Sequence, residues 1–271
     1  MRLALGVSYN GQTYNGWQSQ KDGNTIQDKL EAALGRFATQ DVSTLCAGRT
    51  DSGVHGLMQV VHFDTPIVRP DSSWVRGTNT FLPPDIAVQW ARAVPDSFHS
   101  RACATSRRYA YVLLQSPVRP SVETGRVGWV FNTLDGDAMR QAASYLVGEH
   151  DFTSFRASAC QALTPVKHLH RIDISRRTLI DASVHGMECC YWRFEFEGNA
   201  FLHHMIRNIM GCLIYVGQGK HAPSWIQQVL RARSRDVAAP TFSPDGLYFM
   251  GPRYDTKWGL PDHVPGFDWL P

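Results

Sequence analysis

Hydrophobic and polar residues alternate at the start of the chain, where the apolar ones occupy every second position: Leu3, Leu5, Val7 and Tyr9. This period of two predicts a strand with one buried face. The turn-forming pairs Asn10-Gly11 and Asn15-Gly16 end the strand. From Ile26 onwards the apolar spacing becomes three and four residues, which predicts a helix with Thr25 as its N-cap and Asp28 at the capping-box position.

The same patterns predict further elements along the chain. The expected strands are 42–46, 59–63, 86–90, 109–114, 169–174, 191–197 and 246–250, and the expected helices are 135–146, 203–216 and 225–230. The proline-rich stretch 66–100 is expected to be irregular around its one strand, residues 115–132 to form a loop, and the segment after Pro261 to pack as coil. Strands and helices mix without a sequence repeat, which indicates an α+β protein.

Composition sets the scale of the fold. With 271 residues, of which 43% are hydrophobic and 19% charged, the chain can bury the core of one large or two intimate domains. We expect a first half, residues 1–103, and a second half, residues 104–271. No apolar run has the length of a membrane span, and the N-terminus lacks a signal-peptide cleavage pattern. A cytoplasmic protein that is not in a membrane is therefore expected.

Cysteine spacing and net charge say less about the function of the protein. The six cysteines are irregularly spaced without a Cys-x-x-Cys pair, which favours free thiols in a reducing compartment. The net charge of +3 argues only weakly for a polyanionic partner. Arginine supplies most of the 27 basic side chains, and its guanidinium binds phosphate bidentately and stacks on bases. This composition suits a nucleic-acid partner, although biased codon usage also enriches arginine.

The densest group of reactive side chains lies in one glycine-rich stretch, residues 46–56, between two apolar segments. It holds a carboxylate, a guanidinium, two hydroxyls and a histidine between three glycines. Polar loops between buried strands are where a rigid scaffold presents reactive groups. A phosphate-binding P-loop is excluded, because Val54 and His55 stand where that motif needs lysine and a hydroxyl residue. Taken alone, Asp51-Ser52-Gly53 is also typical of a simple turn.

The decapeptide of residues 47–56 resembles the signature of the TruA family of tRNA pseudouridine synthases. Further segments match this family in order along the chain: Gly16-Trp17-Gln18, Thr25-Ile26-Gln27, Gln59-Val60-Val61-His62-Phe63, Arg107-Arg108-Tyr109-Ala110-Tyr111, Asp151-Phe152-Thr153-Ser154-Phe155-Arg156, and Asn199-Ala200-Phe201-Leu202-His203-His204-Met205-Ile206-Arg207-Asn208. A single decapeptide is moderately specific, but an ordered series from near the start to the C-terminal quarter is strongly specific.

The resemblance implies a fold and an activity. The fold would be two α/β halves that share a central, mainly antiparallel sheet with a cleft between them, and the protein would be a homodimer. The activity would be an isomerase that converts uridine to pseudouridine at positions 38, 39 and 40 in the anticodon stem-loop of tRNA. This redox-neutral reaction requires neither a cofactor nor a metal.

The resemblance also implies roles for single residues. Asp51 matches the family nucleophile, and Arg207 matches the cation expected beside it, because an unpaired carboxylate in a dry pocket tends to become protonated. Arg49 matches an arginine linked to flipping the target nucleotide, which cannot be reached inside a stack. Tyr109 matches the tyrosine that packs on the target base, and its phenol could also shuttle a proton.

Arg107, Arg108 and His203 are the remaining expected substrate-binding residues. Arg107 and Arg108 form a basic cluster at the start of an expected strand. A solvated face is an equally ordinary role for such a cluster.

Two other functions stay open at this point. One is a non-catalytic tRNA-binding protein or RNA chaperone built on the same fold. The other is a metal-dependent hydrolase that uses histidines such as His203 and His204. No acidic residue lies at ligand spacing from these two, and adjacent positions on an expected helix point to different faces. We therefore expect no metal site.

Overall fold

The computed structural model describes residues 1–184 and 187–261. Contacts between Cα atoms divide the chain into two compact units. The first contains Met1–Arg108 and returns at Tyr248, and the second contains Tyr109–Leu247. The sequence suggested a division at 103/104; by contacts, the chain enters the second unit five residues later and its last described stretch, 248–261, lies with the first unit.

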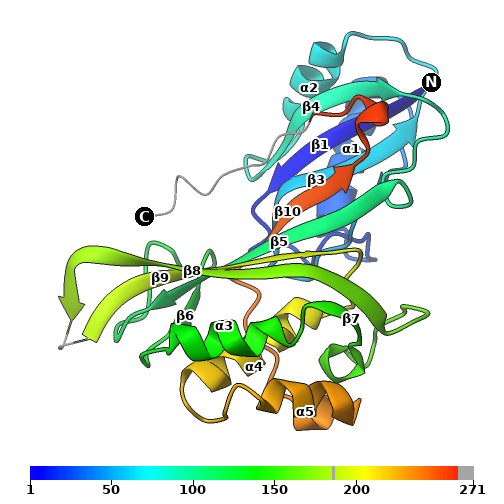
Figure 1. Ribbon diagram of the computed structural model, residues 1–271. Helices are drawn as coiled ribbons and strands as arrows, with labels where there is room; N and C mark the ends of the chain where they lie inside the picture. The colour runs from blue at the N-terminus through cyan, green and yellow to red at the C-terminus, as the bar shows by residue number, and fades with distance from the viewer. Residues whose placement is uncertain (185–186, 262–271) are drawn as a thin grey trace. The chain divides into compact units, whose positions relative to one another are not determined.

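All ten strands in the described part of the chain belong to one sheet, and the strands of the first unit follow the order β4-β1-β3-β10 in it (Figure 1). Its strands are β1 (Arg2–Tyr9), β3 (His55–Asp64), β4 (Ile86–Val94) and β10 (Leu247–Tyr254), and the short β2 (Leu45–Cys46) pairs with β3. β1 is antiparallel to both β3 and β4, whereas β10 is parallel to β3. The expected strand at 42–46 is thus reduced to its last two residues.

Two helices, α1 (Ile26–Ala38) and α2 (Asp71–Asn79), contribute to the larger core of the first unit. The alternating residues of β1 belong to the same buried core as Leu30, Leu34 and Trp74. A smaller core cluster contains Ala4, Val60 and other small side chains around Phe98, with Tyr254 and Trp258 against it. The N-cap of α1 is Thr25, as predicted, and its hydroxyl accepts a hydrogen bond from the Asp28 backbone N–H. Helix α2 lies in the stretch that was expected to be irregular, so that expectation was wrong.

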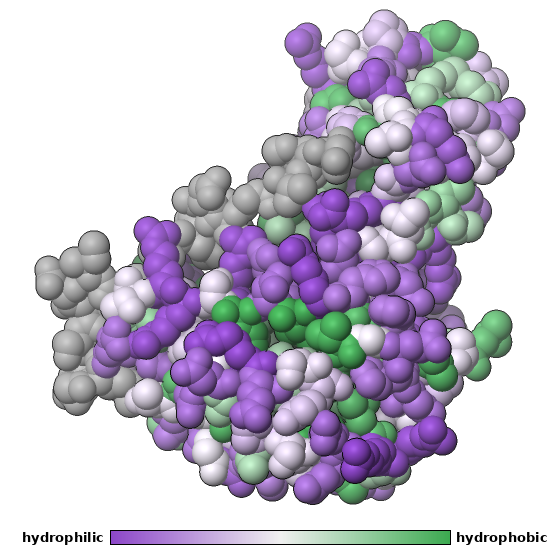
Figure 2. Space-filling model, in the orientation of Figure 1, coloured by the Kyte–Doolittle hydropathy of each residue, from purple (hydrophilic) through white to green (hydrophobic). Residues whose placement is uncertain are grey.

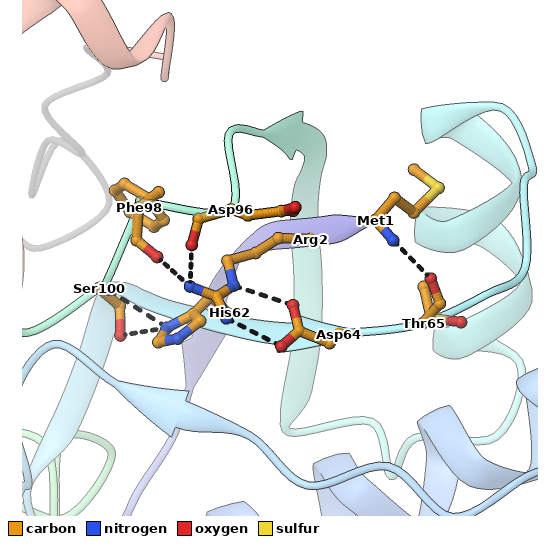
Figure 3. A network of polar contacts seen from close by, with 8 residues as sticks. All are labelled: Met1, Arg2, His62, Asp64, Thr65, Asp96, Phe98 and Ser100. Carbon is orange, nitrogen blue, oxygen red and sulfur yellow. Dashed lines mark hydrogen bonds and ion pairs between the residues drawn. The ribbon is translucent and has the colours of Figure 1, made fainter.

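A polar network closes one end of this sheet (Figure 3). Arg2 donates two hydrogen bonds to the Asp64 carboxylate, at 2.9 and 2.8 Å, and reaches the carbonyls of Asp96 and Phe98. His62 accepts a hydrogen bond at Nδ1 from the Ser100 backbone N–H, at 3.2 Å. The network ties the start of β1 and the end of β3 to the loop after β4.

The strands of the second unit follow the order β5-β9-β8-β7, with β6 beside β5. The strands are β5 (Ala104–Gln115), β6 (Gly128–Val130), β7 (Gly148–Asp151), β8 (Val166–Val184) and β9 (Met187–Gly198). β8 is antiparallel to β7 and β9, and β6 is parallel to β5. β6 falls in the expected loop 115–132, and β7 had no counterpart among the expected strands.

Three helices lie together on one side of the β8–β9 hairpin (Figure 1). They are α3 (Gly136–Ser144), α4 (Met205–Gly217) and α5 (Trp225–Ala232). Figure 2 shows a hydrophobic band across the middle of this unit, where β8 lies over α3, between mostly hydrophilic surroundings. The short helix η1 (Thr153–Phe155) contacts α4, α5 and a second short helix, η2 (Arg235–Val237).

The protein is α+β, as expected, and most of its strand pairs are antiparallel. All six cysteines are free thiols, which also agrees with the sequence. No helix in the described part of the chain is both long and apolar enough to span a bilayer.

Candidate active site

The loop between β2 and β3 carries Asp51 and is tied to the segment that precedes α1. The Trp17 backbone N–H donates to the Thr50 carbonyl at 3.0 Å. The Ser52 hydroxyl donates to the Tyr14 carbonyl at 3.1 Å. These bonds fix the loop on both sides of the carboxylate, so Asp51 sits on an ordered backbone.

Two glycines make this close approach possible. Gly16 has a φ of +87°, and a Cβ there would lie 2.7 Å from the Thr50 carbonyl oxygen and 3.0 Å from the Asp51 carbonyl carbon. At Gly11 a Cβ would lie 1.9 Å from the Val54 carbonyl oxygen. Any side chain at these positions would push the loop away. The glycine of the Gly16-Trp17-Gln18 segment is therefore part of the framework of the Asp51 loop.

Two buried side chains, those of Gln59 and Tyr9, also bond the Asp51 loop. Gln59, which is fully buried, donates its amide to the Gly48 carbonyl and accepts from the Gly48 N–H. The Tyr9 hydroxyl lies 2.8 Å from the Thr50 Oγ1. Buried polar groups with all their hydrogen bonds made are rigid. These bonds hold Gly48 and Thr50, and therefore the backbone that leads to Asp51.

The imidazole of His55 also helps to hold the Asp51 loop in place. Its Nδ1 accepts a hydrogen bond from the Gly11 N–H at 3.1 Å, and its ring stacks on Tyr248 with centroids 4.6 Å apart. Only 2% of its surface is exposed. Because Nδ1 is an acceptor in this bond, the ring proton of the neutral imidazole resides on Nε2.

Asp51 is partly exposed, and Arg49 and Ser52 on either side of it are exposed. The loop thus presents a carboxylate and a guanidinium at the surface, whereas the Ser52 hydroxyl is used in the bond to the Tyr14 carbonyl. An accessible carboxylate on a rigid backbone can act as a nucleophile or a base.

Arg107 is partly buried and bonds backbone carbonyls. It donates to the carbonyls of Ala104, Arg101 and Ala47, the last of these at the start of the Asp51 loop. Arg108 is buried, with 8% of its surface exposed. The guanidinium of Arg107 therefore helps to hold the loop, and a role of either arginine in RNA binding stays a prediction.

The second unit brings together the other predicted residues. Tyr109, at the start of this unit in β5, meets the ring of Phe201 edge to face, with centroids 5.1 Å apart. Phe201 precedes His203 by two residues, and Arg207 lies in the first turn of α4. The Phe201 ring thus links Tyr109 to the segment that carries His203 and Arg207.

Helix α4 begins at Met205, not at His203 as expected. His204 is in the left-handed region with a φ of 61°, and the His203 carbonyl accepts a bond from the Ala157 N–H at 3.0 Å. The two imidazole centroids lie 4.0 Å apart. The argument that two helix faces separate these rings is therefore wrong, because neither residue is helical.

The comparisons with known proteins agree over most of the chain. A family model described as tRNA pseudouridine synthase matches residues 6–101 and 142–255. Three proteins described as tRNA pseudouridine synthase A align over the full length of both chains. The protein from Delftia acidovorans is 74% identical to this chain, that from Acidovorax ebreus 73% and that from Paracidovorax citrulli 72%.

This chain belongs to the tRNA pseudouridine synthase family. The segments matched by the family model contain the Asp51 loop, Gly16, which contacts that loop, and helix α4 with Arg207. The gap between them, residues 102–141, contains Arg107, Arg108 and Tyr109. These three residues fall only within the full-length similarity to the named relatives.

The sequence analysis gave no role to several residues that support the predicted site residues of this pseudouridine synthase family member. Tyr14 and Gln59 support the Asp51 loop, Phe242 bonds Arg207, and Asn208 bonds Thr241. Gln59 and Asn208 stand in segments that match the family, and Arg207-Asn208 is a polar pair inside an otherwise apolar helix. Their partners, however, lie 11 and 33 positions away, and such contacts leave no trace in local spacing.

Proposed function

We propose that this chain isomerises uridine to pseudouridine at positions 38, 39 and 40 in the anticodon stem-loop of tRNA, with Asp51 as the nucleophile on a flipped-out uridine. The observation that carries the proposal is an accessible carboxylate on a backbone fixed by buried groups, in a chain of this family. Family membership along the whole chain favours this activity over RNA binding without catalysis.

The chemistry needs little beyond that carboxylate. The C1′–N1 bond breaks, the uracil turns, and a C1′–C5 bond forms, while C5 loses its proton and N1 gains one. A carboxylate can attack the sugar carbon, as in covalent glycosyl transfer, or the uracil ring. Both routes need Asp51 ionised. The atoms and electrons balance without a cofactor or a metal.

The other predicted residues have complementary roles in this proposal. Arg49 fills the space of the everted uridine or holds its phosphate, and Tyr109 packs on the base, a contact worth about 1–3 kcal/mol. Arg207 keeps the nucleophile ionised through its positive charge. His203, Arg107 and Arg108 contact the RNA, with Arg107 also holding the Asp51 loop through Ala47.

A homodimer working in the cytoplasm, where tRNA is modified, completes the proposal. Sedimentation of the purified protein at several concentrations would reveal a stable dimer or a monomer. A protein that carries stoichiometric metal and loses turnover on chelation would contradict the metal-free chemistry.

The decisive experiment replaces one oxygen of the nucleophile. Asp51→Asn should abolish tritium release from tRNA labelled at C5 of uridine, because an amide cannot form the covalent bond, while tRNA affinity stays within about threefold since base contacts are retained. Asp41→Asn, at an exposed position in the same unit, is the matched control and should release tritium at the wild-type rate. Wild-type turnover by Asp51→Asn would refute the assignment.

A further inference from the structure

The segment Ala239–Ser243, which begins two positions after the end of η2, lies along the first turns of α4. We call this five-residue segment the strap. The Phe242 N–H donates to the Arg207 carbonyl at 3.1 Å, and the Ala239 N–H donates to Cys212 Sγ at 3.3 Å. A Cβ on Gly211 would lie 2.2 Å from the Pro240 carbonyl oxygen. The strap is therefore in direct contact with the helix, without space for even one methyl group between them.

The strap also holds the side chain of Arg207. Arg207 Nε donates to the Phe242 carbonyl at 2.9 Å. Together with the bond from the Phe242 N–H, this clamps one strap residue to both the backbone and the side chain of Arg207. Because the guanidinium is planar, a fixed Nε sets the direction of the two η nitrogens.

Asn208, the next residue, joins the strap to the rest of the helical layer. Its side chain is fully buried. Its amide donates to the Phe155 carbonyl at 2.8 Å, and its Oδ1 accepts from Thr241 Oγ1 at 2.7 Å and from an Arg235 η nitrogen at 3.2 Å. Three partners from three segments converge on one amide, and burying it without them would be costly.

The position of Arg207 thus depends on its neighbour. Phe242, which anchors the guanidinium, follows Thr241, which Asn208 binds. The Tyr111 hydroxyl supports the far end of the strap by donating to the Ser243 carbonyl at 2.9 Å. Arg235 also donates to Thr241 Oγ1, at 3.2 Å, so Asn208 and Arg235 hold Thr241 together. Loss of the Asn208 amide would remove the acceptor of the Thr241 hydroxyl and one partner of Arg235, and we expect the Phe242 carbonyl to shift as a result.

We propose that Asn208 is a positioning residue: it fixes the strap through Thr241 and thereby sets the direction of the Arg207 guanidinium. This inference rests on the proposed function, in which Arg207 keeps Asp51 ionised. Asn208 has no contact with the RNA in this role. Its effect on the reaction passes through Phe242 and Arg207.

The test measures single-turnover tritium release from C5-labelled tRNA, together with tRNA affinity and thermal unfolding. Asn208→Ala should slow the reaction about 100-fold, the cost of a misplaced catalytic group, while tRNA affinity changes by less than about threefold. Loss of packing alone would lower the melting temperature without this separation of rate from affinity.

Thr241 provides a milder variant, because the residue is exposed and the protein should tolerate its replacement. Thr241→Val removes only the hydroxyl and should slow the reaction about fivefold with unchanged tRNA affinity, whereas Thr241→Ser should restore the rate to within about twofold of wild type. If Asn208→Ala does not fold, the Val and Ser pair decides.

Ser154→Ala is the matched control. Ser154 is fully buried in the same layer, donates to the Val229 carbonyl and accepts from the Ser234 N–H, but has no bond to the strap. It should lower the melting temperature and leave the single-turnover rate within about twofold of wild type. Variants at 208 and 241 that keep the wild-type rate, or a control that slows the reaction equally, would overturn the proposal. A fully active Asp51→Asn would instead refute the proposed function.

Discussion

Gly16 and Gly11 are required by contacts with the backbone around Asp51, at Thr50 and Val54. A turn residue is usually explained by its own conformation, and Gly16 does have a positive φ. Here glycine is required for a second reason, because the backbone of the neighbouring Asp51 loop occupies the space that a side chain would need. The reactive loop is therefore shaped by a segment that lies more than 30 positions earlier in the chain.

His62 gives the first unit a pH-dependent stability. Burial lowers the pKa of its imidazole to about 4, and the nearby His99 and Arg2 add to this, against an ordinary value of 6.5. The unfolded chain therefore binds a proton before the native one does, and stability is lost as pH falls from about 6.5 to about 4. The loss should reach at most about 1.4 kcal/mol per pH unit.

His62→Gln should remove this part of the pH dependence, because glutamine does not titrate. Urea unfolding at pH 7, 6 and 5 measures it, and the wild-type free energy of unfolding should fall more steeply toward pH 5 than that of the variant. Asp64 behaves differently, because its hydrogen bonds from Arg2 hold its pKa below 3.8 and its contribution is lost only at lower pH. Parallel curves for the two proteins would contradict the role of His62.

For single residues, the sequence points to candidate reactive groups more readily than to the residues that support them. Asp51 and Arg207 stand in dense motifs, so a family resemblance suggests roles for them, and these roles stay predictions. Gln59 and Asn208 belong to such motifs too, yet their partners, Gly48 and Thr241, lie 11 and 33 positions away. Their importance follows from burial and hydrogen bonding, and neither property can be read from local spacing.

Helices α1 and α2 differ in how strongly their sequences specify them. Ile26–Ala38 combines a capping residue with a regular apolar stripe, and the structure confirms the predicted helix. Asp71–Asn79 contains serine, glycine, threonine and asparagine, which are weak helix formers. Burial of Trp74 against Phe37 and Phe63 stabilises this second helix through tertiary contacts. Propensity alone therefore missed it.

Thr25→Ala should destabilise the first unit by about 1 kcal/mol, because the Asp28 N–H at the start of α1 loses its acceptor. The hydroxyl also donates to the Asp28 carboxylate at 2.5 Å, so the variant loses both bonds. Urea unfolding measures the change. Thr13→Ala, in an exposed loop of the same unit, should be neutral, and equal stability of all three proteins would contradict the importance of the cap.

For the whole molecule, binding of tRNA should depend strongly on salt. The net charge is only +3, so long-range attraction is modest, and affinity must come from local contacts between arginines and phosphates. Each such contact releases counterions, and six of them would lower affinity about 1,000-fold between about 50 and 200 mM salt. Filter binding over that range measures the slope. A flat response would exclude phosphate contacts as the source of affinity.

The chain leaves the first unit within β5 and comes back to it only at β10. During synthesis the ribosome must therefore complete about nine-tenths of this sequence before the strand that pairs with His55 and Gly56 exists. Until then the edge of β3 stays open at these two residues, because β2 covers only Val61 and His62, and an open edge invites pairing with other nascent chains. A stop codon shortly before Tyr248 would leave the N-terminal portion prone to aggregation, even though it ends far from Asp51 in the sequence.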